Sequence, residues 1–175
     1  PLVNVEAIKK AKFRVVVDGV NSTGGIAIPR LLEELGVETT KLYCDPTGHF
    51  PHNPEPLKEH LTDLSEAVKY SACDFGIVVD PDVDRLAFMD ENGEMFGEEY
   101  TLVACADYVL SQTPGNTVSN MSSTRALSDV TAKHGGQYEA SAVGEVNVVE
   151  LMKKNNAIIG GEGNGGIIYP ELHYG

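Results

Sequence analysis

Hydrophobic positions along the 175-residue chain follow two spacings, and each spacing predicts one kind of element. Short apolar runs rich in β-branched residues predict buried strands at 13–18, 37–43, 74–79, 85–89, 117–120, 137–141 and 157–160. Apolar residues three or four positions apart predict helices at 5–12, 26–35, 57–72, 98–110, 124–133 and 146–154. Because strands and helices alternate, we expect an α/β fold made of two consecutive α/β domains, each a mixed sheet flanked by helices.

A turn-rich stretch at 111–116 interrupts this pattern and is the candidate linker. It predicts a first domain at 1–112 and a second at 115–175. About sixty residues is little for an independent core, so we expect the second domain to be truncated. The chain also begins with Pro1, so we expect a fragment of a longer protein.

An acidic motif follows the expected strand at 74–79. Asp80, Asp82 and Asp84 alternate with other residues, and Arg85 comes next. Three carboxylates this close repel one another in a partly buried loop, and a hard divalent cation with oxygen ligands would make them compatible. The guanidinium of Arg85 presents donors suited to phosphoryl oxygens. We therefore expect a metal site at the three aspartates, with a solvated acidic turn without an ion as the alternative.

The spacing of the aspartates also occurs at the start of calcium-binding EF-hand loops. The sixth position of such a loop needs glycine for a sharp turn, and here it holds Arg85. The flanking segments are strand-like, whereas an EF-hand needs helices. Magnesium binds through few carboxylates and keeps positions open for water or phosphate oxygens. We therefore expect Mg²⁺.

The overall composition excludes several classes of protein. Hydrophobic residues make up 42% of the chain and charged residues 22%, which is typical of a globular protein. With 13 basic and 26 acidic residues the formal charge is −13, which argues against nucleic acid or an anionic membrane as a partner. No apolar run approaches the ~18 residues needed to span a bilayer. Three widely spaced cysteines, Cys44, Cys73 and Cys105, predict reduced thiols in a cytoplasmic protein.

Two further loops are candidates for binding. The glycine-rich stretch 19–25 is either a structural turn or a phosphate cradle before a helix, although its spacing matches neither dinucleotide nor nucleoside-triphosphate loops. The proline-rich loop 45–56 contains His49 and His52, for which solvated and metal-binding or catalytic roles both remain open.

A second glycine-rich stretch, 160–166, lies between two apolar runs. Its glycines let the backbone turn tightly and let a ligand approach closely. Glu162 and Asn164 are the side chains that it presents, and a carboxylate with an amide suits a pair of sugar hydroxyls. A hairpin with a glycine-rich turn is an equal alternative.

The two loops together resemble motifs of the α-D-phosphohexomutases. Residues 80–85 (Asp-Pro-Asp-Val-Asp-Arg) resemble the family's metal loop, Asp-Gly/Pro-Asp-x-Asp-Arg. Residues 161–166 are similar to its sugar loop, usually Gly-Glu-x-Ser-Gly-His, and 143–145 resemble the Val-Gly-Asp or Thr-Gly-His element before that loop. Residues 18–25 and 50–56 resemble segments near the start of the family's second domain.

The resemblance implies the function of a longer enzyme. Phosphohexomutases are four-domain cytoplasmic enzymes that interconvert hexose 1-phosphates and 6-phosphates through a phosphoserine and a bisphosphorylated sugar. The resemblance places Mg²⁺ on the three aspartates, gives Arg85 a catalytic role in stabilising the phosphoryl group, and gives sugar binding to Gly161, Glu162, Gly163 and Asn164. The implied partners are a hexose phosphate and the family's first and fourth domains.

Departures from the family pattern limit what carries over. Neither the Ser-His-Asn-Pro phosphoserine loop nor a fourth-domain phosphate loop is present, so the chain resembles domain two and most of domain three, and we expect it to be inactive alone. Asn164 stands where serine is usual, Gly166 where histidine is usual, and Ala142 where many members have lysine. Glucose, mannose and glucosamine phosphates therefore all remain candidates, with a weak preference for glucosamine phosphate.

Two other functions are compatible with the same residues. An aspartyl-phosphate phosphatase also has an Asp-x-Asp pair after an apolar strand, with the first aspartate as nucleophile. That class needs Thr or Val where this chain has Asp84, and a later lysine that is not evident near the pair Glu98 and Glu99. A non-catalytic metal- or sugar-binding module is the other alternative.

Overall fold

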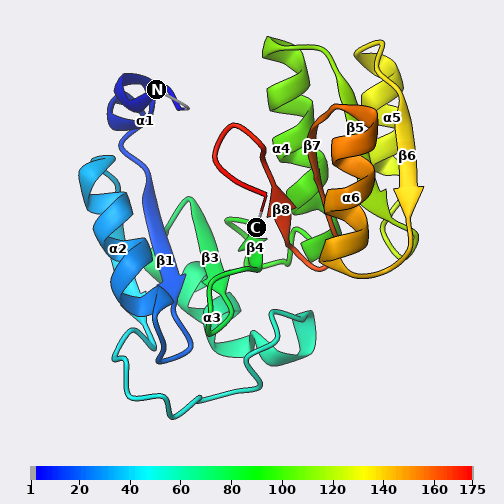
Figure 1. Cartoon of the computed structure of the whole chain (residues 1–175). Coiled ribbons are helices and arrows are strands. Elements are labelled where there is room, and N and C mark those ends of the chain that lie inside the picture. The colour runs from blue at the N-terminus through cyan, green and yellow to red at the C-terminus, as the bar shows by residue number, and fades with distance from the viewer. Residues whose placement is uncertain (1–2, 175) are drawn as a thin grey trace. The chain divides into compact units, whose positions relative to one another are not determined.

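The computed structural model describes residues 3–174, which form two compact units divided between Phe96 and Gly97. Each unit holds a four-stranded mixed sheet between helices (Figure 1). The predicted class, two consecutive α/β domains with mixed sheets, is therefore confirmed.

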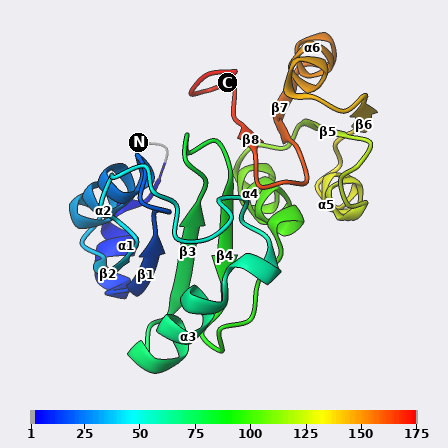
Figure 2. The same ribbon diagram turned by 90° about the horizontal axis from the view of Figure 1, so that it is seen from below.

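The first unit is built on the sheet β2-β1-β3-β4, seen from a second direction in Figure 2. Strands β2, β1 and β3 are parallel, and β4 is antiparallel to β3. The elements are α1 (Val5–Ala11), β1 (Arg14–Asp18), α2 (Gly24–Glu34), β2 (Glu38–Leu42), the 3₁₀ turn η1 (Lys58–His60), α3 (Thr62–Ser71), β3 (Phe75–Val79) and β4 (Leu86–Met89).

Alternation along β1 divides the core of the first unit between two faces of the sheet. Val15 and Val17 join α2 and the partly buried side of α1 in one cluster, whereas Val16 joins α3 in the other. All three valines are fully buried. A strand with successive side chains on opposite faces can be apolar at every position only when both faces are covered, so this unit has three layers, α/β/α.

Most predicted elements of the first unit are one or two residues shorter in the structure, and two of the differences have a visible cause. The helix expected at 57–72 is a 3₁₀ turn followed by α3, because Leu61 between them has φ −110° and ψ 27°, outside the α-helical region. The strand expected at 85–89 begins at Leu86, because the backbone N–H of Arg85 donates to the side chain of Asp80.

The second unit repeats the same arrangement with the sheet β6-β5-β7-β8. Strands β6, β5 and β7 are parallel, and the short β8 is antiparallel to β7. The elements are α4 (Glu98–Gln112), β5 (Asn116–Asn120), α5 (Ala126–Lys133), β6 (Tyr138–Ser141), α6 (Glu145–Asn155), β7 (Ala157–Gly161) and β8 (Ile167–Ile168). Helices α4 and α5 pack on one face of the sheet and α6 on the other.

The position of α4 differs from the domain division expected at 111–116. Leu102, Ala106 and Leu110 of α4 pack with Leu127 and Ile159, which belong to the second unit. The turn-rich stretch 111–116 is therefore a connection inside the second unit, and the division falls before α4. Local composition marked a turn, but the side chains that share a core determine which domain a helix belongs to.

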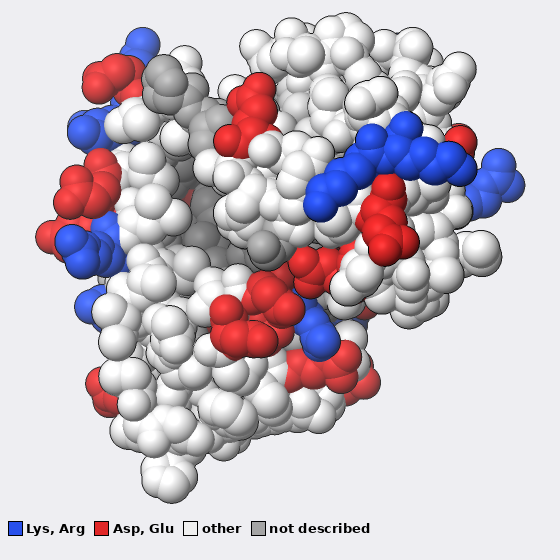
Figure 3. All heavy atoms as spheres, in the orientation of Figure 1, with Lys and Arg blue, Asp and Glu red and all other residues white. Residues whose placement is uncertain are grey.

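Charged side chains of both signs are interspersed with uncharged surface on the face drawn in Figure 3. Within residues 3–174, no helix combines the length and the apolar character that crossing a membrane would require.

Candidate functional site

The acidic loop connects β3 to β4 at one end of the first unit's sheet. Val79 pairs with Leu86, so residues 80–85 form a tight connection between two antiparallel strands. The N–H of Val83 donates to the carbonyl of Asp80 at 3.2 Å and closes a turn. Val83 itself has φ +63°, an uncommon and strained conformation for a β-branched residue. The loop is thus held in one shape that the local sequence does not favour by itself.

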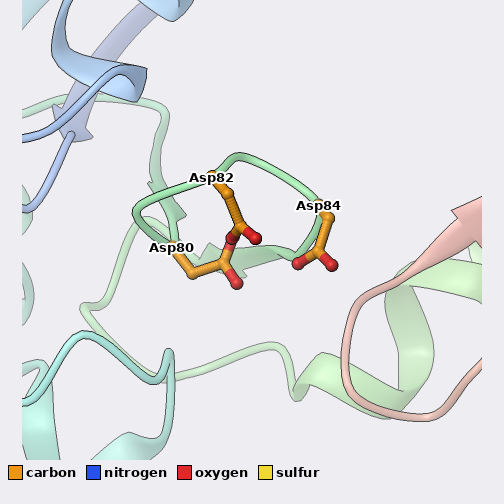
Figure 4. A group of neighbouring side chains, drawn as sticks. All are labelled: Asp80, Asp82 and Asp84. Atoms are coloured by element: carbon orange, nitrogen blue, oxygen red, sulfur yellow. The ribbon is translucent and has the colours of Figure 1, made fainter.

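The three predicted aspartates lie together on this loop. One carboxylate oxygen from each of Asp80, Asp82 and Asp84 can be chosen so that all three atoms lie within 4.8 Å of one another. Figure 4 shows the three carboxyl groups on the same side of the loop. Asp80 is 5% exposed, and the other two are exposed to solvent. A cation would therefore have one buried ligand and two ligands open to water.

The electrostatics of this group are unfavourable without a cation. Burial, first of all, and the nearby Asp84 and Asp82 together raise the pKa of Asp80 to about 6. The N–H of Arg85, which donates to Asp80 Oδ1 at 3.0 Å, opposes this effect. An ionised carboxylate that is destabilised by burial and by like charges is a group that a divalent cation would stabilise.

Arg85 is surrounded by three carboxylates. Its Nε lies 3.6 Å from Asp80 Oδ2 and 3.8 Å from Asp84 Oδ1, and its Nη1 lies 3.6 Å from Glu55 Oε1. These distances are longer than hydrogen bonds, so the three carboxylates attract the guanidinium without fixing its orientation. Glu55 belongs to the long loop before η1, and its proximity to Arg85 could not be seen from the sequence.

The glycine-rich turn 19–25 contacts both the acidic loop and the end of β3. Ser22 Oγ donates to the carbonyl of Pro81 at 2.9 Å. A Cβ on Gly24 would lie 2.3 Å from Cγ2 of Val79, the last residue of β3, so only glycine fits there. These contacts are those of a structural turn, the first of the two roles considered for this stretch.

The two histidines of the proline-rich loop lie outside the aspartate group. His52 Nε2 is 2.9 Å from Asp18 Oδ2, and its Nδ1 donates to the carbonyl of Asn53 at 2.7 Å. Asp18 ends β1 and is fully buried; burial raises its pKa, while the N–H of Val20 and the His52 ring oppose that rise. His52 thus links the proline-rich loop to the end of β1. His49 is exposed to solvent.

The glycine-rich loop of the second unit joins β7 to β8. Gly161 pairs with Ile167, and the N–H of Glu162 donates to the carbonyl of Gly166 at 3.0 Å. A Cβ on Gly161 would lie 2.1 Å from that carbonyl oxygen, so the close approach requires glycine. The N–H of Gly166 donates to Asn164 Oδ1 at 3.0 Å, so the amide oxygen of Asn164 shapes the loop from within.

Glu162 is half-buried, and its carboxylate is held by one donor at the end of β5 and one in the loop after β6. Asn120 Nδ2 donates to Glu162 Oε1 at 2.6 Å, and the N–H of Gly144 donates to the same oxygen at 3.1 Å. Asn120 ends β5, and Gly144 and Glu162 follow β6 and β7; the three strands are parallel, and their carboxyl ends meet at one edge of the sheet. This is the edge at which open α/β sheets bind ligands.

Sequence reasoning identified Glu162 and the element containing Gly144, but not Asn120. A signal for it was present, since Asn120 is the polar last residue of the predicted strand 117–120. Gly163 lies against Ser123: a Cβ added to Gly163 would lie 3.0 Å from the Cα of Ser123. The loops after β5 and β7 therefore pack directly on each other.

The fold and the two loops define a class of protein, a tandem of α/β/α domains with an acidic loop in the first and a glycine-rich loop in the second. Two family models match it: phosphoglucomutase/phosphomannomutase, alpha/beta/alpha domain II over residues 1–93 and domain III over residues 97–175. The chain belongs to the phosphoglucomutase/phosphomannomutase family. The resemblance inferred from the two loops is confirmed.

Two relatives match more than nine tenths of the chain. A phosphoglucomutase/phosphomannomutase of Thermococcus kodakarensis is 40% identical over 175 residues, which is 99% of this chain and 38% of that protein. A probable phosphoglucosamine mutase of Methanopyrus kandleri is 34% identical, over 92% of this chain and 36% of that protein. The chain thus spans less than two fifths of the length of these relatives.

A solved structure agrees with the fold. The crystal structure of a phosphoglucomutase/phosphomannomutase family protein from Burkholderia thailandensis matches with a TM-score of 0.86 and 29% identity. The match covers 98% of this chain and 39% of that one. The α/β fold of the chain is therefore shared with a known member of the family.

Proposed function

We propose that this chain is the metal-binding and sugar-binding part of a phosphohexomutase that interconverts hexose 1-phosphates and hexose 6-phosphates. In this proposal the phosphoserine and the grip on the distal phosphate come from further domains of the same protein, and the chain alone has no mutase activity. The observation that carries the proposal is the group of three carboxylates around the buried Asp80, in a chain that belongs to this family.

The aspartates fit a magnesium ion by their chemistry. All three donors are carboxylate oxygens, which Mg²⁺ prefers, and two of the three residues are exposed, which leaves coordination positions for water or phosphate. Bound there, the ion would supply positive charge to a phosphoryl group during transfer. Asp80 anchors the site, because its other contact, the N–H of Arg85, fixes the direction of its carboxylate.

Arg85 is the proposed catalytic residue of this part of the enzyme. Its guanidinium is about a third exposed and lies within 4 Å of Asp80, Asp84 and Glu55 without a short hydrogen bond to any of them. It can therefore turn towards the phosphoryl oxygens while the carboxylates keep it at the loop. A guanidinium placed in advance where negative charge develops stabilises the transition state.

The loop containing Glu162 is the proposed sugar site. Glu162 accepts two hydrogen bonds through Oε1, and neither of them uses Oε2, which can accept from a sugar hydroxyl. Asn164 uses its Oδ1 within the loop, so its Nδ2 is the group that can donate to a hydroxyl. Gly161 and Gly163 act through the shape of the loop, since a side chain at either would meet neighbouring backbone atoms.

The accessibility of Asp80 argues against the phosphatase alternative. An aspartyl nucleophile must expose an oxygen to the phosphorus atom of its substrate. Asp80 is 5% exposed, its Oδ1 accepts from Arg85, and its Oδ2 faces the guanidinium. The arrangement suits a ligand that holds a cation better than a nucleophile.

Calorimetry with the purified chain tests the metal site. We expect Mg²⁺ or Mn²⁺ to bind with one-to-one stoichiometry, and Asp82→Asn and Asp84→Asn each to weaken binding about tenfold or more, since each removes a charged ligand. Glu91→Gln is the matched control, because Glu91 lies in another acidic turn, between β4 and the following segment. Equal affinities in all four proteins would contradict the proposed site.

Activity assays test the division of labour. The chain alone should not convert glucose 1-phosphate to glucose 6-phosphate, nor hydrolyse p-nitrophenyl phosphate, with Mg²⁺ present. Turnover of the first substrate would contradict the requirement for further domains. Turnover of the second that Asp80→Asn abolishes would favour the phosphatase alternative instead.

A further inference from the structure

Asn120, at the carboxyl end of β5, is buried and has its amide orientation fixed by its neighbours. It is 3% exposed. Its Oδ1 accepts from the N–H of Ser122 at 3.2 Å, from Ser122 Oγ at 2.9 Å and from Ser123 Oγ at 2.7 Å. A backbone N–H can only donate, so the atom facing Ser122 must be the carbonyl oxygen, and the NH₂ group must point the other way.

The NH₂ group points at Glu162. Its Nδ2 donates to Glu162 Oε1 at 2.6 Å, and the N–H of Gly144 converges on the same oxygen at 3.1 Å. A carboxylate with two donors on one oxygen has little freedom to rotate, and the direction of its second oxygen is set as well. Glu162, in the loop after β7, is therefore held from the end of β5 and from the loop after β6.

A second asparagine on the same strand shows what a purely structural role looks like. Asn116 begins β5, donates through Nδ2 to the backbone carbonyl of Asn155 at 3.0 Å and accepts from the N–H of Gln137 at 3.0 Å. Both of its partners are backbone atoms that join neighbouring segments. Asn120 instead gives its donor to an ionisable side chain at the ligand-binding edge of the sheet.

We propose that Asn120 is a positioning residue that orients the Glu162 carboxylate so that Oε2 faces the sugar. This rests on the proposed sugar role of Glu162. Glutamate has three rotatable side-chain bonds, and a carboxylate that is already oriented loses less conformational entropy when a sugar hydroxyl binds. Ser122 and Ser123 contribute to this positioning, because their hydrogen bonds keep the side-chain amide of Asn120 from rotating.

The first experiment measures the orientation of Glu162 without any sugar. Asn120→Asp keeps an acceptor for the two serines but replaces the donor to Glu162 with a negatively charged oxygen. We expect NMR couplings and side-chain relaxation of Glu162 to show one rotamer in the original chain and averaging in the variant. The double variant N120D/E162Q should restore a single rotamer at position 162, because the glutamine amide can donate to the new carboxylate. Asn116→Asp is the control and should leave Glu162 ordered.

The second experiment measures binding of glucose 6-phosphate to the same proteins by NMR titration. We expect N120D and Glu162→Gln each to weaken binding by about tenfold or more, since each removes a hydrogen bond to or from a charged group, and N116D to leave affinity unchanged. In the Glu162→Gln variant, adding N120D should cause no further loss of affinity, because Asn120 acts through Glu162.

The outcomes separate the two claims. If Glu162→Gln binds glucose 6-phosphate as the original chain does, the sugar role of Glu162 is wrong, and the proposed function with it. If Glu162→Gln weakens binding but N120D leaves the rotamer and the affinity unchanged, only the positioning role is wrong. If N120D does not fold, Ser123→Ala carries the test: it removes one of three bonds to Oδ1 and should disorder Glu162 in part. An ordered Glu162 in that variant would overturn the positioning role.

Discussion

Asp80→Asn should affect the metal-free and the metal-bound protein in opposite directions. Without a cation, burial and two neighbouring carboxylates raise the pKa of Asp80 from 3.8 to about 6. A raised carboxyl pKa means that ionisation disfavours the folded state, by about 1.4 kcal/mol per pH unit of difference. Because Asp80 is buried but Asp82 and Asp84 are exposed and screened, we expect a cost of about 2–3 kcal/mol once Asp80 is ionised.

The sign of the pH dependence follows from that shift. Below about pH 3 the carboxyl is neutral in both states and contributes no cost. The cost develops as the pH rises through 3.8 and is nearly complete above about pH 6, where the folded protein also ionises. In EDTA, Asp80→Asn should therefore be more stable than the original chain at pH 7.5 and equally stable at pH ~3. The asparagine Oδ1 can still accept from the N–H of Arg85, so the loop keeps its hydrogen bond.

Magnesium should reverse the order. A ligand that binds only the folded state adds about 4.1 kcal/mol at a thousand times its Kd, which exceeds the cost in EDTA and corresponds to about 8–16 °C in Tm for a chain of this size. Asp80→Asn should lose most of this gain, because it removes the charge of the buried ligand. The assay is urea unfolding followed by circular dichroism, in EDTA and in Mg²⁺, with Glu91→Gln as control. A variant that is less stable in EDTA at pH 7.5, or that gains as much from Mg²⁺, would refute the reasoning.

Two further predictions concern the second unit. The Thr131 hydroxyl donates to the carbonyl of Leu127 and so accepts from the Thr117 hydroxyl, both at 2.6 Å. Thr131→Val should lower the free energy of unfolding by about 1–3 kcal/mol, more than Thr117→Val does, because only the first substitution leaves a buried donor unpaired. Equal losses of stability in urea unfolding would contradict this. Asp107 accepts from His134 Nε2 at 2.7 Å and Lys133 Nζ at 3.0 Å, contacts that lower its pKa. The stability that these contacts add is present above the ordinary pKa of 3.8 and is lost as the pH falls through the lowered value. Asp107→Asn should therefore be less stable than the original chain at pH 6, and the difference should shrink as the pH falls below 3.8 in thermal scans. A constant difference would show that Asp107 acts without its charge.

Much of the fold was determined by local sequence pattern. The apolar runs at β1 and β3 and the helical spacing of α2 each depend on residues within one element, so the sequence predicted them nearly to their ends. The family and the acidic motif were also readable, because a motif of six residues is a local property. What the sequence misplaced was α4, since its apolar face fits either domain and only contacts with distant residues such as Ile159 assign it.

The candidate sites show the same division. The sequence by itself determined which groups are chemically able to bind: three alternating carboxylates, an arginine beside them, and a glutamate in a glycine-rich loop. Tertiary structure decided which of these groups are buried, oriented or tied to others. Glu55 reaches Arg85 across 30 positions and Asn120 reaches Glu162 across 42. Contacts of that length arise because parallel strands bring their carboxyl ends to one edge, and strand order is set by packing of the whole unit rather than by any local run of residues.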